Sequence, residues 1–95
     1  MFHTVQIIMD VFGRPVFVVP AVLPESCLIQ VDDAALEFLD GSQKLGRIAD
    51  VDPYILALVA RQPEVGLISY PENSRAPCPD SLTHIAAVRD LREEA

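Results

Sequence analysis

The chain has little cysteine and histidine, with two of each among its 95 residues. These four residues are Cys27, Cys78, His3 and His84. Two cysteines are too few for the disulfide framework that holds small secreted domains together. The four side chains are also scattered, and none has a partner at metal-ligand spacing. We therefore expect no bound metal and no cofactor, and in a reducing compartment both cysteines would be free thiols.

Basic side chains are also scarce: seven Lys and Arg residues stand against fourteen Asp and Glu, which gives a formal net charge of −7. Such a field repels phosphate backbones, so direct nucleic-acid binding through a basic patch is not expected. It also disfavours an anionic membrane surface. A basic protein partner remains compatible with this charge. All basic residues except Lys44 are arginines, a bias that hints at a GC-rich bacterial coding sequence.

Long hydrophobic runs are absent, and the longest, residues 16–23, is interrupted by Pro20. It is far shorter than a membrane-spanning helix. The N-terminus also lacks a basic segment followed by an apolar stretch and a small-residue cleavage site. We therefore predict a cytoplasmic protein without membrane contact. Because 51% of the residues are apolar, we expect residues 1–95 to fold as one small globular domain around one core.

Alternation of apolar and polar residues predicts several short strands. Four are expected, over residues 3–11, 16–19, 27–31 and 65–70. In the first, every second residue from Val5 to Val11 is apolar, which is typical of a half-buried strand. Gly13 can adopt the positive φ of a tight hairpin turn, and Asp10 is expected to pair with Arg14 across it.

Helices are predicted in the remaining segments, over residues 33–40, 53–62 and 80–93. Asp32 or Asp33 suits the start of the first helix and Gly41 suits its end, and Glu37 is expected on its outer side. Residues 41–50 are predicted to be a polar connection. Asp52-Pro53 is the clearest helix start, because a capping residue precedes proline at the first helical position.

The resulting order is β-β-β-α-α-β-α. It indicates an α+β fold: a small mixed or mostly antiparallel sheet of three to four strands with helices packed on one face.

The helix predicted over 53–62 is apolar all round from Tyr54 to Ala60, so both of its sides need cover. One hypothesis buries Ile55, Leu58 and Val59 and offers Leu56 and Ala60 to a partner, or the reverse. A homodimer would cover such a face, because one patch serves both copies. Alternatively, the strands and the last helix cover it internally. Loop residue Arg75 is a further candidate contact. The candidate partner-binding residues are therefore Tyr54, Leu56, Ala60 and Arg75.

The segment Cys78-Pro79-Asp80-Ser81 is the most suggestive place for catalysis, since a helix N-terminus favours a thiolate. It resembles the active-site turn of monothiol glutaredoxins over these four residues. In that family the motif opens an early helix and is followed by two strands and a cis-proline, whereas here one predicted helix ends the chain. His84 could act as a base for Cys78, but no third group is available to orient it.

We therefore favour a non-catalytic protein–protein interaction module: a self-associating adaptor, inhibitor or regulatory subunit. A small thiol-dependent enzyme or redox protein using Cys78 is one alternative. A second is an acidic mimic of nucleic acid that inhibits a basic partner. A third is a small ligand bound beneath the loop 71–80.

Overall fold

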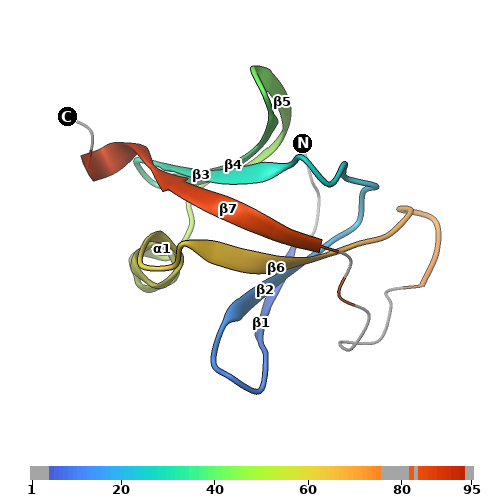
Figure 1. Ribbon diagram of the computed structural model, residues 1–95. Coiled ribbons are helices and arrows are strands. Elements are labelled where there is room, and N and C mark those ends of the chain that lie inside the picture. The colour runs from blue at the N-terminus through green and yellow to red at the C-terminus, as the bar shows by residue number, and fades with distance from the viewer. Residues whose placement is uncertain (1–4, 76–81, 83, 94–95) are drawn as a thin grey trace.

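The computed structural model describes residues 5–75, 82 and 84–93. Its strands form one seven-stranded mixed sheet in the order β1-β2-β6-β7-β3-β4-β5. They are β1 (Gln6–Met9), β2 (Pro15–Val19), β3 (Leu28–Asp32), β4 (Ala35–Asp40), β5 (Gln43–Ile48), β6 (Glu64–Ser69) and β7 (His84–Asp90). The sheet curls into a half-barrel beside the helix α1 (Pro53–Ala60), and a 3₁₀ turn, η1 (Leu91–Glu93), follows β7 (Figure 1).

The fold corrects the predicted α+β arrangement. A sheet of three to four strands with helices packed on one face is wrong: the sheet has seven strands, and α1 is the one α-helix within the described ranges. β2 pairs parallel with β6, and β3 pairs parallel with β7, while the other neighbours are antiparallel. The strands predicted over 16–19, 27–31 and 65–70 correspond to β2, β3 and β6.

The helix predicted over 33–40 is instead β4. Leu36 and Phe38 are both fully buried on the face that carries the main core, and Glu37 between them points to the other face, where it too is buried. Because both faces are buried there, apolar residues occupy nearly every position of the strand. The residue pattern of such a strand cannot be told apart from that of a buried helix. Asp33 does not cap a helix. It lies in the β3–β4 turn with φ 53°, a conformation that aspartate tolerates better than most residues.

The polar connection predicted over 41–50 contains β5. Gly41, which does not end a helix, lies with φ 62° in the two-residue turn between Asp40 and Gln43, which pair across the β4–β5 hairpin. Gly41 and Ser42 are the two central residues of this turn, and glycine at the first of them supplies the positive φ that such hairpin turns require. β5 looks like a loop in sequence because it is an edge strand with much of its surface in solvent.

The helix predicted over 80–93 is also wrong over its described residues, most of which form β7. The helical spacing of Ile85, Val88 and Leu91 coincides with an alternating pattern in which Ala86 and Val88 face the main core. β7 lies between β6 and β3 and joins the two halves of the sheet. This pairing with distant strands, which local periodicity does not reveal, decides its structure.

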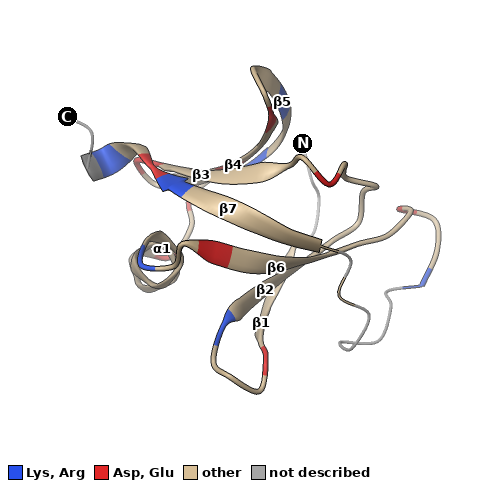
Figure 2. Ribbon diagram, viewed as in Figure 1, with Lys and Arg blue, Asp and Glu red and all other residues tan. Residues whose placement is uncertain are grey.

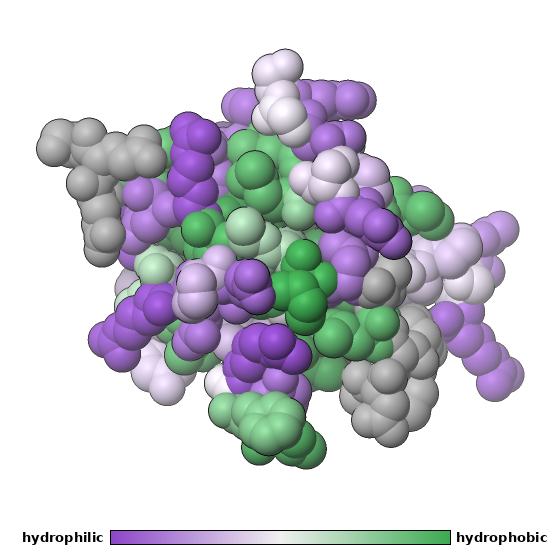
Figure 3. Space-filling view, viewed as in Figure 1, coloured by the Kyte–Doolittle hydropathy of each residue, from purple (hydrophilic) through white to green (hydrophobic). Residues whose placement is uncertain are grey.

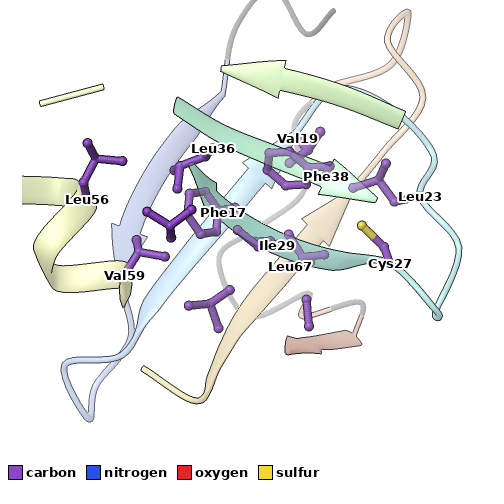
Figure 4. Packing of buried hydrophobic residues seen from close by; sticks show 13 residues of the cluster. Phe17, Val19, Leu23, Cys27, Ile29, Leu36, Phe38, Leu56, Val59 and Leu67 are labelled. Carbon is purple, nitrogen blue, oxygen red and sulfur yellow. The ribbon is translucent and has the colours of Figure 1, made fainter. Parts of the chain in front are cut away.

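The main core fills the inner face of the half-barrel, which we define as the face carrying Phe17 and Phe38. Their rings meet edge to face, with centroids 5.8 Å apart and an interplanar angle of 87°. Figure 4 shows the buried side chains of this cluster between the strands and α1. A smaller cluster on the outer face consists of Val16, Val18 and Ile68 with Ile8 and Tyr70 packed against it.

The predicted start of the helix at Asp52-Pro53 is confirmed. The Asp52 carboxylate accepts a hydrogen bond from the Tyr54 N–H at 2.8 Å, and Pro53 needs no N–H partner. The buried residues of α1 are Leu56 and Val59, which face the main core. Of the helical segments that the structure describes, none has the length and apolar character required to traverse a lipid bilayer.

Candidate protein-binding surface

The turn between β1 and β2 is held by the carboxylate of Asp10. Its Oδ1 accepts the N–H groups of Phe12 at 2.9 Å and Arg14 at 2.7 Å, and its Oδ2 accepts Arg14 Nε at 3.0 Å. The Asp10 N–H also donates to the Arg14 carbonyl at 3.0 Å, and Gly13 adopts φ 77°. The predicted turn and the predicted Asp10–Arg14 pair are therefore confirmed.

These hydrogen bonds act electrostatically as well as geometrically. The Arg14 N–H lowers the pKa of the Asp10 carboxyl below its ordinary value, with help from the Phe12 N–H and the Arg14 guanidinium. The carboxylate is thus charged at neutral pH and neutralised within its own turn. The turn consequently presents no uncompensated charge beside the apolar side chains that it carries.

The same turn displays large apolar side chains to solvent. Val11 is 93% exposed, Phe12 is 90% exposed and Met9, at the end of β1, is 50% exposed. We call these three residues the hairpin surface. Figure 3 shows hydrophobic side chains projecting at the bottom of the molecule, where Figure 1 places the β1–β2 turn. A single exposed apolar residue is ordinary, but three at one end of a hairpin make this surface a candidate contact site.

Sequence reasoning missed this surface. The alternation from Val5 to Val11 assigned Met9 and Val11 to the buried face, which is wrong because β1 ends at Met9 and the chain then turns outward. Ile7 packs against the main core, whereas Ile8 packs against the outer cluster. The available signal was Val11-Phe12 itself, since turns ordinarily carry polar residues and glycine.

The predicted contact residues of α1 differ in how far they are exposed to solvent. Tyr54 is 75% exposed and borders a shallow depression with Ala57, Leu58 and Arg61. Leu56 is only 4% exposed and lies in the main core, so its side chain is not on the surface. Ala60 is half-buried against the same core. The accessible side of α1 is therefore its Tyr54 side.

Arg75 is exposed in the loop that follows β6. In Figure 1 this loop and α1 lie at opposite sides of the view, so the structure does not bring the two predicted contact segments together. Most of the loop 71–80, beneath which a small ligand was considered, lies outside the described residues.

The candidate catalytic residues are not assembled into a site within the described residues. Cys78 lies outside them, and His84 begins β7 instead of lying one turn into a helix. Both ring nitrogens of His84 are buried and have no hydrogen-bond partner among the residues that the structure describes. In the described part of the chain, no three His, Cys, Asp or Glu side chains gather where they could hold a metal ion.

Cys27 is buried, with 3% of its surface exposed. Burial raises the pKa of its thiol to about 11, so it is protonated at neutral pH. Since the thiolate is the nucleophile, Cys27 is a core residue and not a reactive one.

A polar row crosses the outer face of the sheet, and sequence reasoning did not predict it. Gln30 on β3 and Glu37 on β4 are register partners that are 8% and 2% exposed. Lys44 on β5 places its Nζ 3.4 Å from Glu37 Oε2, an oxygen that makes no hydrogen bond. The expectation of an exposed Glu37 on the outer side of a helix is therefore wrong. The pair ties the edge strand β5 to the buried strand β4.

The acidic residues within the described ranges do not form one dense row. Figure 2 shows them on separate strands and loops. Asp10, Glu37 and Asp90 also pair with cations of the chain itself. This distribution gives less support to mimicry of a nucleic acid, in which phosphate-like charges would need to line up.

The hairpin surface is thus the candidate site with the best-defined geometry. It combines exposed apolar side chains with a turn fixed by hydrogen bonds, and it adjoins an edge strand. Comparison of the chain with protein-family models, with curated proteins and with solved structures found no match.

Proposed function

We propose that this chain is a non-catalytic protein–protein interaction module, of the adaptor, inhibitor or regulatory-subunit kind, that binds through the hairpin surface of Met9, Val11 and Phe12. One observation carries the proposal. Val11 and Phe12 are almost fully exposed at the tip of a hairpin whose turn is fixed by the Asp10 carboxylate.

The energetics favour binding at this tip. Burying a Phe or Val side chain stabilises a complex by roughly 1.5–3 kcal/mol. Aromatic anchors are also typical of the few residues that dominate an interface. Because the Asp10 network already holds the turn, little conformational entropy is lost when a partner covers it.

The chemistry of the partner follows from the charges. The hairpin surface is apolar, and Asp10 beside it is paired with Arg14 at 3.0 Å. The partner therefore needs an apolar surface that receives Phe12, while the net charge of −7 disfavours strongly acidic partners.

Photo-crosslinking in the native host tests this proposal. Replacing Phe12 by p-benzoylphenylalanine places the reactive group at the hairpin tip, and the same replacement of Val22, which is 74% exposed outside the hairpin, is the matched control. We expect irradiation to yield a defined protein adduct from position 12 and none from position 22. The absence of an adduct from position 12, or equal adducts from both positions, would contradict the proposal.

A further inference from the structure

The two edges of the sheet differ in how they are protected. At one edge, β5 carries the cations Lys44 and Arg47, and its pairing with β4 shifts register between Phe38 and Leu39. At the other edge, β1 is regular and carries no charge and no proline. Charges and bulges are two of the devices by which sheets block edge-to-edge pairing. Of these two edges only β5 has them, so among the residues that the structure describes β1 is the edge left open to another strand.

The backbone groups that β1 offers can be assigned from its hydrogen bonds. Asp10 N–H donates to the Arg14 carbonyl at 3.0 Å, so Asp10 and Arg14 form a hydrogen-bonded pair at the end of the β1–β2 ladder. Such pairs alternate along an antiparallel ladder, so Ile8 also bonds toward β2. The N–H and C=O groups of Ile7 and Met9 therefore point to the open edge. They have no partner among the residues that the structure describes.

We propose that the strand completing this edge is β1 of a second copy of this chain, paired antiparallel across a twofold axis at Ile8; the inference rests on the proposed function and names its partner. A twofold axis perpendicular to the sheet places the inner faces of both copies on the same side of the joined sheet, and the outer faces on the other side. Ile7 of each copy then lies opposite Met9 of the other, and each such pair exchanges N–H···O=C bonds in both directions.

The choice of Ile8 as the centre follows from the side chains. With the axis at Ile8, the Ile8 side chains of the two copies lie opposite each other. Ile7 of one copy lies opposite Met9 of the other, so apolar residues lie opposite apolar residues. With the axis at Ile7, Gln6 would lie opposite Ile8, a polar side chain against an apolar one. The centre at Ile8 also brings the hairpin surface of each copy beside the start of β1 in the other.

The charges permit this contact even though each chain carries −7. β1 is uncharged, and the nearest carboxylate, Asp10, is neutralised by Arg14 at 3.0 Å within its own turn. The remaining repulsion between the two chains is long-range, and salt screens it. We therefore expect the dimer to strengthen as the salt concentration rises.

Sedimentation equilibrium of the full chain and of Met9→Pro tests the strand pairing. Proline at position 9 removes an outward N–H without removing a bond to β2, a position where edge strands tolerate it. We expect the wild-type chain to dimerise and the dissociation constant of the Met9→Pro dimer to be at least tenfold higher. Far-UV circular dichroism of the variant reports whether it is folded. A wild-type monomer up to about 1 mM, or a folded Met9→Pro dimer of wild-type affinity, would overturn the proposal.

Cysteine crosslinking tests the register and does not depend on the proline variant. Directly opposite residues of a non-hydrogen-bonded pair have Cα atoms about 4.5 Å apart, which suits a disulfide. In a Cys78→Ser background, Ile8→Cys should link the two copies through a disulfide between their substituted positions on mild oxidation, and Gln6→Cys should not. Equal crosslinking, or none from position 8, would overturn the pairing at Ile8.

The failures of the two proposals remain distinguishable. A monomeric chain that gives a Phe12 photo-adduct with a different protein would overturn the paired dimer and leave the proposed function standing. A dimer that crosslinks through position 8, that keeps its affinity in Phe12→Ser and that gives no adduct from a photoprobe at position 12 would support the strand pairing and contradict the role of the hairpin surface.

Discussion

The Asp10 carboxylate binds Arg14 twice, accepting its backbone N–H on Oδ1 at 2.7 Å and its guanidinium Nε on Oδ2 at 3.0 Å. The Asp10 side chain thus holds the backbone of the turn and also pairs with the guanidinium charge of Arg14. This relationship joins the geometry of the hairpin to the binding function that we propose for it.

The Asp10 network predicts a pH-dependent contribution to stability. Because the folded-state pKa of Asp10 is lowered, its contribution is fully present above the unfolded pKa, about 3.9. It is lost as the pH falls through the folded value. We expect Asp10→Asn to lower the melting temperature at pH 7 and the difference from wild type to vanish in acid.

Thermal unfolding followed by circular dichroism from pH 7 to pH 2 measures this difference. Glu25→Gln is the control, since Glu25 is exposed and we expect its replacement to leave the pH 7 melting temperature unchanged. A pH-independent difference between Asp10→Asn and wild type would show that the carboxylate charge is not the stabilising feature.

The assignment of the α1 faces predicts opposite results for two neighbouring truncations. Leu56 is 4% exposed within the main core, whereas Tyr54 is 75% exposed. Leu56→Ala should reduce the free energy of unfolding by about 2–5 kcal/mol, the range for buried leucines. Tyr54→Ala should change it by no more than about 0.5 kcal/mol, as surface substitutions do.

Urea denaturation of both variants measures these changes. If Leu56→Ala unfolded at the wild-type midpoint, the helix would present Leu56 to solvent, as one of the sequence hypotheses allowed. The two faces of α1 would then be reversed, and a partner could bind there.

Features set by a few neighbouring residues were the predictable ones. Asp52-Pro53 fixes a helix start through one hydrogen bond and one φ angle, and Gly13 with Asp10 fixes a turn in the same local way. Such signals depend on residues within one turn of each other. They therefore act in the same way whatever the rest of the fold is.

The strands β4 and β7 were not predictable from local pattern. Leu36 and Phe38 lie on one buried face of β4, and Ala35 and Glu37 lie on the other, so no alternation of apolar and polar residues remains to be seen. Glu37 is a good helix former in isolation, but the neighbouring strands β3 and β5 decide its conformation.

The candidate site was only partly visible in the sequence. Phe12 beside Gly13 was recognisable as an apolar residue in a turn, which is unusual enough to notice. The openness of β1 was not, because it depends on the strand order that places β1 at an edge. An edge is a property of the whole sheet, and no segment encodes it alone.

The packing at Gly66 predicts a destabilising overlap. A Cβ at this position would lie 2.8 Å from Leu82 Cδ1 and 3.1 Å from Val16 Cγ2, both closer than ordinary contact. Gly66→Ala should therefore reduce the free energy of unfolding by about 1–3 kcal/mol, as overpacking does.

A double-mutant cycle with Leu82→Ala measures how much of this cost arises from Leu82. We expect the second substitution to recover part of the stability lost in Gly66→Ala, giving a coupling of at least about 0.5 kcal/mol. Additive effects of the two substitutions would show that Leu82 does not lie over Gly66 in solution.

The burial of Cys27 predicts a thiol that reacts only when the chain unfolds. Its pKa is raised to about 11, chiefly because burial disfavours the thiolate, so the folded protein holds it protonated at pH 8. Since the unfolded thiol ionises near pH 8.5, the folded state should also lose stability relative to the unfolded state as the pH rises above that value.

In a Cys78→Ser variant, where Cys27 is the one remaining thiol, an aromatic disulfide reagent measures this reactivity. We expect negligible labelling of the native protein at pH 8 and complete labelling in denaturant, with a native rate that does not exceed the opening rate of the core. Rapid native labelling would mean that Cys27 is accessible and ionised. It would then replace Cys78 as the first candidate for thiol chemistry, and the assignment of this chain to non-catalytic modules would have to be reconsidered.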